Sequence, residues 1–368
     1  MGVSLESGKL FRVQDAYLAP AFERVDYHLS CIPSDPFDVP DEIYRPGRFS
    51  LVTFESETDQ NLDGALHDPY RDPLAPPQPF QYALHVAFHH HDEKVLVIDA
   101  SLFPPEGENS DSRLLSEAFS RGWRRFIVFG LKGQRFHGCG FGPDSGGVRI
   151  DIYGSSGDYL GSGIDGLSIH VHGNAQDQVG QIMKAGKIVI YGETGQTFLY
   201  GAKGGEVYVM GNAAGRPLIN AVGKPRVLIN GTCLDYLAES FMAGDPLNGG
   251  GFVILNGLEF DQEGRVKPQA TPYPGSNLFS LASGGAIYVR DPLRLIDEEQ
   301  LNGGEIVSLE DQDWFLILPY LQENEKLFGI RVEEDLLKVN GETRRPFEVY
   351  RKVRPKSAPD LNKDGLQE

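Results

Sequence analysis

Apolar residues alternate with other residues in four short segments that recur every 19 residues. The segments read IDIYG (150–154), IHVHG (169–173), IVIYG (188–192) and VYVMG (207–211), each with β-branched residues two and four positions before a glycine. Alternation with a period of two predicts a β-strand, and recurrence at one interval predicts equivalent strands stacked in register. The chain is therefore predicted to be mainly β, with a solenoid of parallel strands in units of roughly 19 residues.

The same pattern continues on both sides of these segments, and every strand ends near a glycine. Such glycines are needed where the chain turns with positive φ or where backbones crowd. Asp158, Asp177 and Asp235 follow four residues later, and we expect them to form turns by accepting hydrogen bonds from local backbone amides. The predicted structural turn glycines are Gly130, Gly154, Gly173, Gly192, Gly211, Gly231 and Gly257.

Composition changes along the chain and suggests five divisions. These are an irregular N-terminal arm with short strand-like pieces (1–80), a small α/β unit (81–129), the solenoid (130–304), a C-terminal cap with an amphipathic helix (305–354) and a disordered tail (355–368). The helix is expected to cover the last unit, because an open sheet edge invites aggregation. An insertion at 258–276 interrupts the period, and insertions in solenoids form loops that often meet a partner.

Charge and cysteine content exclude several classes of function. The net charge of −18 disfavours nucleic acid or an anionic membrane as a general partner. No apolar run approaches the length of a membrane span, and the first residues lack the pattern of a secretory signal. Cys31, Cys139 and Cys233 form no disulfide framework or iron–sulfur motif, which favours a reducing, cytoplasmic location.

Five segments carry a resemblance to a known family. They are GQRFHG (133–138), GSSGDYLGSGIDG (154–166), GNAQDQVGQIMKAGKIVIYG (173–192), GAKGGEVYVMG (201–211) and YLAESFMAG (236–244). They resemble the GXGXG β-helix domain at the C-terminal end of the glutamate synthase large subunit, and the related subunit of formylmethanofuran dehydrogenase. The resemblance is closest to stand-alone glutamate-synthase-like subunits.

The Gly-x-Gly-x-Gly motif itself stands at Gly138, Gly140 and Gly142. Two departures from the family pattern are visible, since Leu199 and Ala238 occupy usual glycine turn sites. The segment 215–231 has also lost the glycine-rich turn expected there.

The resemblance implies a right-handed parallel β-helix that carries no catalytic residues or cofactor of its own. It implies a scaffold subunit of a glutamate-synthase-like complex, whose class II amidotransferase-like and flavin/iron–sulfur synthase-like partners hold the FMN and iron–sulfur clusters. Three alternatives stay open: a subunit of a formylmethanofuran-dehydrogenase or formyltransferase-like complex, an enzyme with its own site between arm and β-helix, and a homo-oligomer.

Histidines offer the main candidate metal ligands. His85, His89 and His91 share one face of a predicted strand and could bind a divalent ion, although HHHDEK also fits a solvated hairpin end. We expect His170 and His172 to lie on opposite faces of one unit, with His170 pointing outward.

Two further motifs have both a chemical and a structural interpretation. GCGFGPDSGG (138–147) could hold an anion through consecutive backbone amides, or could simply form a wide turn. The aspartates Asp144, Asp158, Asp177 and Asp235 could be acid–base pairs, but their recurrence at one turn position favours structure.

An outward column of large side chains predicts a covered surface, because such a stripe is costly in water. The cover would be either the N-terminal arm or another subunit. This possible partner face consists of Tyr153, Tyr191, Tyr208, Met210 and Leu228.

Overall fold

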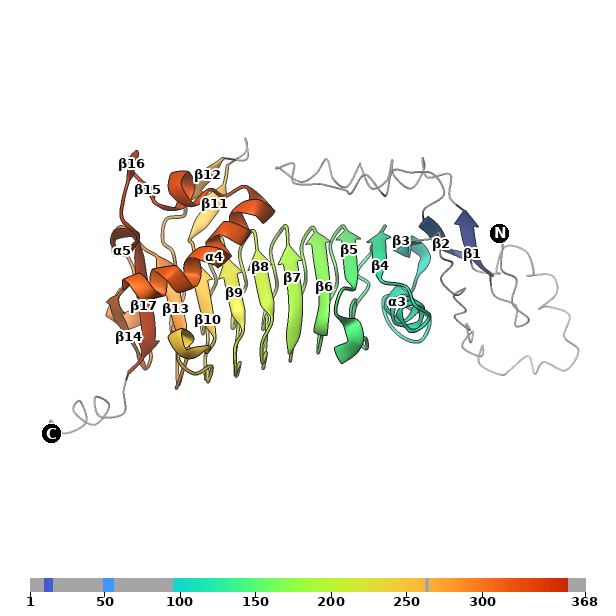
Figure 1. Ribbon diagram of the computed structural model, residues 1–368, viewed down its shortest axis with the longest axis horizontal. Helices are drawn as coiled ribbons and strands as arrows, with labels where there is room; N and C mark the ends of the chain where they lie inside the picture. The colour runs from blue at the N-terminus through green and yellow to red at the C-terminus, as the bar shows by residue number, and fades with distance from the viewer. Residues whose placement is uncertain (1–9, 16–48, 56–94, 262–264, 357–368) are drawn as a thin grey trace, which may run out of the picture.

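The protein is described by a computed structural model in which residues 10–15, 49–55, 95–261 and 265–356 are placed. A single sheet of 13 strands runs through these residues in the order β1-β2-β3-β4-β5-β6-β7-β8-β9-β10-β13-β17-β14 (Figure 1). Neighbouring strands from β2 to β13 are parallel, whereas β1, β17 and β14 pair antiparallel with their neighbours. The described part is thus mainly β, with one large and mostly parallel sheet.

The strands of this sheet are β1 (Leu10–Asp15), β2 (Phe49–Glu55), β3 (Val95–Asp99), β4 (Arg125–Phe129), β5 (Arg149–Tyr153), β6 (Asp165–His172), β7 (Ala185–Ile190), β8 (Glu206–Val209), β9 (Arg226–Ile229), β10 (Phe252–Leu255), β13 (Ala286–Arg290), β14 (Gly304–Ser308) and β17 (Tyr350–Pro355). Two short hairpins, β11 (Leu258–Phe260) with β12 (Val266–Pro268) and β15 (Lys338–Val339) with β16 (Glu342–Thr343), stand apart from it. The α-helices are α3 (Asp111–Ser120), α4 (Asp311–Phe328) and α5 (Pro346–Val349).

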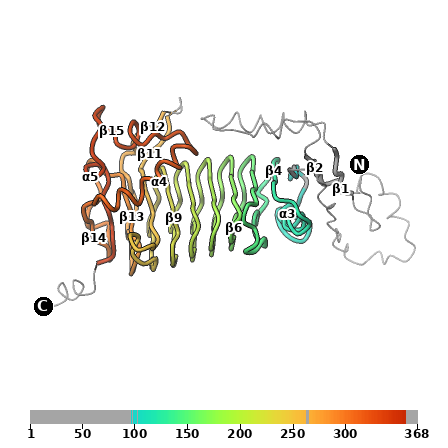
Figure 2. Tube along the Cα trace, viewed as in Figure 1, coloured from blue at the N-terminus to red at the C-terminus, as the bar shows by residue number. Residues whose placement is uncertain are grey.

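The apolar columns predicted from the 19-residue period are confirmed as the register of the sheet. Ile150 pairs with Ile169, and Ile169 pairs with Ile188. Ile188 in turn pairs with Val207. Figure 2 shows the successive units stacked side by side. All four side chains are buried.

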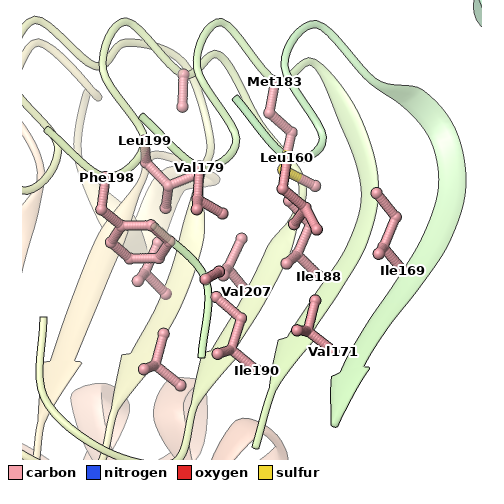
Figure 3. Close-up of a cluster of buried hydrophobic side chains, with 14 of the residues drawn as sticks. Leu160, Ile169, Val171, Val179, Met183, Ile188, Ile190, Phe198, Leu199 and Val207 are labelled. Atoms are coloured by element: carbon pink, nitrogen blue, oxygen red, sulfur yellow. The ribbon is translucent and has the colours of Figure 1, made fainter. Parts of the chain in front are cut away.

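The return segments between the strands stack in the same way. The amide of Leu199 donates to the carbonyl of Val179 at 2.7 Å, and the amide of Leu218 donates to the carbonyl of Phe198 at 2.7 Å. Their side chains meet the strand columns in one apolar core (Figure 3). Because full burial of each such side chain contributes roughly 1.5–3 kcal/mol, the contacts between neighbouring units stabilise the whole stack.

The glycines after the strands serve mainly close approach of neighbouring units. A Cβ at Gly192 would lie 2.2 Å from Oδ1 of Asn174, and one at Gly173 would lie 2.6 Å from the carbonyl oxygen of Gly154. Neither glycine has a positive φ. Crowding between stacked turns, and not turn conformation, therefore requires glycine at these two positions.

Helix α4 lies across the outer face of the sheet (Figure 1). Near its start Asp313 accepts a hydrogen bond from the hydroxyl of Tyr288 in β13 at 2.7 Å, and at its end Phe328 packs edge-on against Tyr191, just after β7, at 5.2 Å. The expectation that this helix covers the last unit is wrong, because its buried side chains pack on the apolar outer columns of the sheet. The sheet instead ends in the antiparallel strands β17 and β14.

The N-terminal side of the sheet is built from several short pieces. Strands β1 and β2 come from the range 1–80, which the sequence assigns to an irregular arm with strand-like pieces. In the predicted α/β unit, α3 begins after Ser110, whose hydroxyl accepts from the amide of Arg113 at 3.3 Å. The predicted strand that carries His85 and residues 357–368 of the predicted tail lie outside the described residues. The tail assignment is wrong at Pro355, which is the last residue of β17. Among the helices that are described, none is long and apolar enough to cross a membrane.

Candidate functional site

The possible partner face is buried within the chain. Tyr191, Tyr208 and Met210 are each 8% exposed or less, and Leu228 is 1% exposed. These four side chains form one apolar cluster with the inner side of α4. The predicted cover was the N-terminal arm or another subunit, whereas helix α4 of the chain itself lies there. The fifth residue, Tyr153, is also buried and stacks on His172, with ring centroids 4.3 Å apart.

A polar cluster lies on the outer face of β5 and β6, next to this column. Arg149 donates to both carboxylate oxygens of Asp151 at 2.8 Å, and Asp151 lies 3.3 Å from Nε2 of His172. The His172 ring is sandwiched between Tyr153 and Tyr191. Asp151 and His172 are 5% exposed, so the pair is almost enclosed.

Burial and pairing set the protonation states of this cluster. Burial alone would raise the pKa of Asp151, but hydrogen bonds from His172 and Arg149 outweigh it and hold that pKa well below its usual range. Burial lowers the pKa of His172. Burial, aided by Arg149, also lowers the pKa of His170 to about 3. Near neutral pH the cluster therefore holds a charged Arg–Asp pair beside two neutral imidazoles.

The prediction that His170 and His172 lie on opposite faces is wrong. Residues two apart on a strand share a face. His170 and His172 of β6 therefore both lie on the outer side of the sheet, on the same side as Asp151. His85, His89 and His91 lie outside the described residues. Within the described part, no group of three histidine, cysteine or carboxylate side chains is arranged to hold a metal ion.

A groove of ≈ 790 Å³ runs past His172 at the carboxyl ends of the stacked strands, with the β11–β12 hairpin on its other side. Its polar lining is already bonded from unit to unit. Oδ1 of Asn174 accepts from the amide of Glu193 at 2.9 Å, and Oδ1 of Asn212 accepts from the amide of Thr232 at 2.9 Å. The groove has room for a small ligand, but these amide side chains are committed to structure.

A second cluster has the order of a serine–histidine–carboxylate triad. Nε2 of His137 lies 2.8 Å from Asp111, and Nδ1 lies 3.0 Å from the hydroxyl of Ser156. Asp111 and His137 are fully buried and Ser156 is 1% exposed, so a substrate cannot reach the serine. The array instead ties α3 to the first stacked units. Sequence reasoning missed it, although His137 belongs to the quoted GQRFHG segment.

The Gly-x-Gly-x-Gly segment forms a wide turn against α3. Gly138, Gly140 and Gly142 have φ values of 82°, 82° and 72°, in the left-handed region. Between them, Phe141 packs on Phe119 at a centroid distance of 4.9 Å. The thiol of Cys139 is largely enclosed, and burial raises its pKa to about 11. The turn interpretation accounts for each of these contacts.

Comparison with known proteins agrees with this geometry. The family model described as the GXGXG motif matches residues 130–356. The chain belongs to the GXGXG motif family. This is the family of the glutamate synthase large-subunit domain, so the resemblance drawn from the sequence is confirmed. The chain is also similar to the uncharacterized protein MJ1350 of Methanocaldococcus jannaschii, with 32% identity over 212 residues, 56% of this chain and 75% of the relative.

In this GXGXG family member, the left-handed turns persist where glycine has been replaced. Leu199 has φ 59° and Ala238 has φ 57°. In the segment 215–231, Leu218 and Asn220 have φ values of 60° and 56°. At these departures from the family sequence pattern, the backbone therefore keeps the left-handed conformation that Gly161 and Gly180 adopt in neighbouring units.

The aspartates of this GXGXG domain act between units and not locally. Asp158 accepts from the amide of Asp177 at 3.2 Å, and Asp177 accepts from the amide of Gln196 at 2.8 Å. Asp235 accepts from the amide of Ser276 at 2.7 Å. The predicted bonds to local amides are thus replaced by bonds to the next unit. Asp144 lies in a short 3₁₀ turn (Pro143–Ser145), away from this ladder.

Proposed function

We propose that the protein is a non-catalytic scaffold subunit of a glutamate-synthase-like complex. In this proposal the stacked units form a right-handed parallel β-helix, and its stiffness holds catalytic partner subunits at fixed separation. The partners are class II amidotransferase-like and flavin/iron–sulfur synthase-like chains, which carry the FMN and iron–sulfur clusters. Family membership supports the class of complex, and the stacking supports the mechanical role.

The observation that carries the proposal is that the polar side chains of the stack bind neighbouring units of the fold. Asp158, Asp177 and Asn174 each bind an amide of the following unit, as Asp235 does later in the chain. The array of Asp111, His137 and Ser156 is sealed in the interior. These groups connect elements of the fold to one another. Side chains committed in this way resist bending of the stack and leave little polar chemistry for a substrate.

The experiment is purification of the native complex through an affinity tag on this chain. We expect stoichiometric copies of an amidotransferase-type or flavin-type chain, with FMN and iron retained by the partners after dissociation. The isolated chain should show no glutaminase or glutamate synthase activity. A chain that purifies alone from its native cells, at all ionic strengths, would contradict the proposal.

A second candidate function is an enzyme with its own site, and one observation favours it. The buried Asp151–His172 pair stands beside the ≈ 790 Å³ groove, and a carboxylate-oriented imidazole can move a proton. Mass spectrometry and metal analysis of the isolated chain separate the two functions. A stoichiometric ligand that is lost in His172→Phe but kept in His170→Phe would favour the enzyme. The same native purification identifies a formylmethanofuran-dehydrogenase-like complex, if that is the assembly.

A further inference from the structure

Apolar side chains line one outward side of the return segments, opposite the core. Ile182 is 47% exposed, Tyr200 is 37% exposed and Met242 is 50% exposed. They come from stacked units, since the amide of Ile182 donates to the carbonyl of Tyr200 at 2.8 Å and Val222 bridges to Met242 in the next unit. We call this surface the return ladder, and it consists of Ile182, Lys184, Tyr200, Lys203, Lys224 and Met242.

Ile182 has an unfavourable backbone conformation, and its half-exposed side chain gains little from burial to offset that cost. Its φ is 51°, where a β-branched residue is strained. The equivalent residues of the units on either side are Gly163 and Gly201, which adopt φ values of 71° and 61° without that cost. An isoleucine at this position forms an apolar knob between two glycines. The strain is unexplained by the chain's own packing but is explained if another molecule covers the knob.

A row of lysines runs beside these apolar side chains. Lys184, Lys203 and Lys224 are all exposed. Lys184 lies 3.5 Å from Asp165, whereas Lys203 and Lys224 form no ion pair with any residue in the described ranges. The chain as a whole has a net charge of −18. The return ladder is therefore a locally basic, apolar surface on an acidic protein.

We propose that the return ladder is the docking surface for a partner protein segment that carries carboxylates beside apolar side chains. This inference rests on the proposed scaffold function and specifies where a partner binds. A second copy of the chain fits less well, because a two-fold contact would set the lysines of one ladder against those of the other. Nucleic acid also fits less well, since the overall negative charge repels it.

The experiment uses the complex purified for the proposed function, dissociated and reconstituted from this chain and its partner chain. In Lys203→Glu/Lys224→Glu we expect the affinity to fall about tenfold or more, with the wild-type affinity itself falling as salt is raised. The matched control is Lys326→Glu on α4, where the side chain is 75% exposed and remote from the ladder in sequence. Its affinity should stay within about twofold of wild type.

Two more measurements test the apolar part and the identity of the occupant. Ile182→Gly should weaken the complex without lowering the Tm of the free chain, whereas a purely structural role predicts a lower Tm. Carbodiimide coupling, which joins amines directly to carboxylates, should link Lys203 or Lys224 to an Asp or Glu of the partner chain.

Several results would overturn the inference. If the complex assembles and the double lysine variant binds like Lys326→Glu, the ladder is not the docking surface and the scaffold function stands. Cross-links from Lys203 to another copy of this chain would show that the ladder binds a second copy and not a partner protein. A gel shift of a short duplex DNA or RNA that the lysine variant abolishes would show that it binds nucleic acid. Failure of any complex to form would overturn both the inference and the scaffold function.

Discussion

Asn230 and Asn324 exchange two hydrogen bonds, of 2.8 and 3.0 Å, between the sheet and helix α4. Both side chains are fully buried. Asn256 from the next unit donates to the same oxygen of Asn230 at 2.9 Å, and the hydroxyl of Tyr350 donates to Asn256. A buried amide network of this kind admits one register of the helix, because any shift would leave several polar groups unpaired.

Asn324→Ala is therefore expected to lower the free energy of unfolding by about 2–3 kcal/mol, since it leaves the Asn230 amide buried without its partner. Gln322→Ala, at an exposed position of the same helix, is the control and should change it by less than about 0.5 kcal/mol. Urea denaturation followed by circular dichroism measures both. Equal effects of the two substitutions would show that the network does not hold the helix.

The array of Asp111, His137 and Ser156 is expected to be structural. His137→Ala should cost about 3 kcal/mol of stability, because Oδ2 of the buried Asp111 loses its partner and only Oδ1 keeps one, the amide of Ser112. Ser156 should remain unlabelled by a fluorophosphonate probe in the native chain, as should its exposed neighbour Ser155, which serves as control. Stoichiometric labelling of Ser156, lost in His137→Ala, would instead reveal a working hydrolytic site.

Leucine 199 offers a test of the left-handed ladder. Leu199 is fully buried with φ 59°, so both small replacements lose core packing, but only glycine relieves the backbone. Leu199→Gly should therefore be less destabilising than Leu199→Ala, by about 1 kcal/mol. Val179, in the preceding unit, is equally buried but has no positive φ. At that position Val179→Gly should be more destabilising than Val179→Ala. Denaturation of the four variants measures this reversed order. If Leu199→Gly is more destabilising than Leu199→Ala, the prediction is wrong.

The close stacking of the turns predicts a sharp difference between two glycines. Gly192→Ala should destabilise the chain by about 2–3 kcal/mol, because its Cβ would lie 2.2 Å from Oδ1 of Asn174 and would displace that inter-unit bond. Gly215→Ala is the control, since the nearest atom to its Cβ is 4.0 Å away and its φ is not positive. Thermal unfolding measures both variants. A Gly192→Ala chain as stable as the control would show that the turns can separate.

Stability should fall as the pH drops through the range set by His170. Burial lowers the pKa of His170 from 6.5 to about 3, so between these values the unfolded chain binds more protons than the folded chain. The free energy of unfolding therefore decreases as pH falls from 6.5, because Arg149, His172 and Lys187 add to burial in opposing a charge on His170, and Asp151 offsets this only in part. His170→Phe should flatten the Tm-versus-pH profile between pH 6.5 and 4. A profile as steep as that of the wild type would assign the effect to other groups.

The sheet could be predicted from the sequence because its signal is local and repeated. Ile169 and Ile188 stand at the same position of successive units, and their spacing determines the register. The location of α4 could not be predicted in this way, since amphipathicity shows that a helix has an inner face but not which surface it covers. The Asn230–Asn324 contact joins residues 94 apart and has no sequence signal.

The candidate site was harder to predict, for reasons visible in individual residues. Leu199 adopts a conformation that its residue type disfavours, so propensity points away from the observed backbone. Asp177 has the sequence of a local turn former, but its acceptor oxygen faces the amide of Gln196 in the next unit. The Asp151–His172 pair depends on which side chains of adjacent strands are neighbours, and this follows only once the register and the facing of β6 are known.

Helix α4 also limits how this protein can change in length. Its contacts begin at Tyr288 in β13 and end at Tyr191 just after β7, so a rigid element of fixed size spans the intervening strands. Loss or gain of one repeat inside that span would move one anchor by about 4.8 Å and break the fit at one end. Repeats on the β4–β6 side have no such strut among the described residues. We therefore expect shortening or lengthening of the stack during evolution to be tolerated on the β4–β6 side, and the span under α4 to keep constant dimensions.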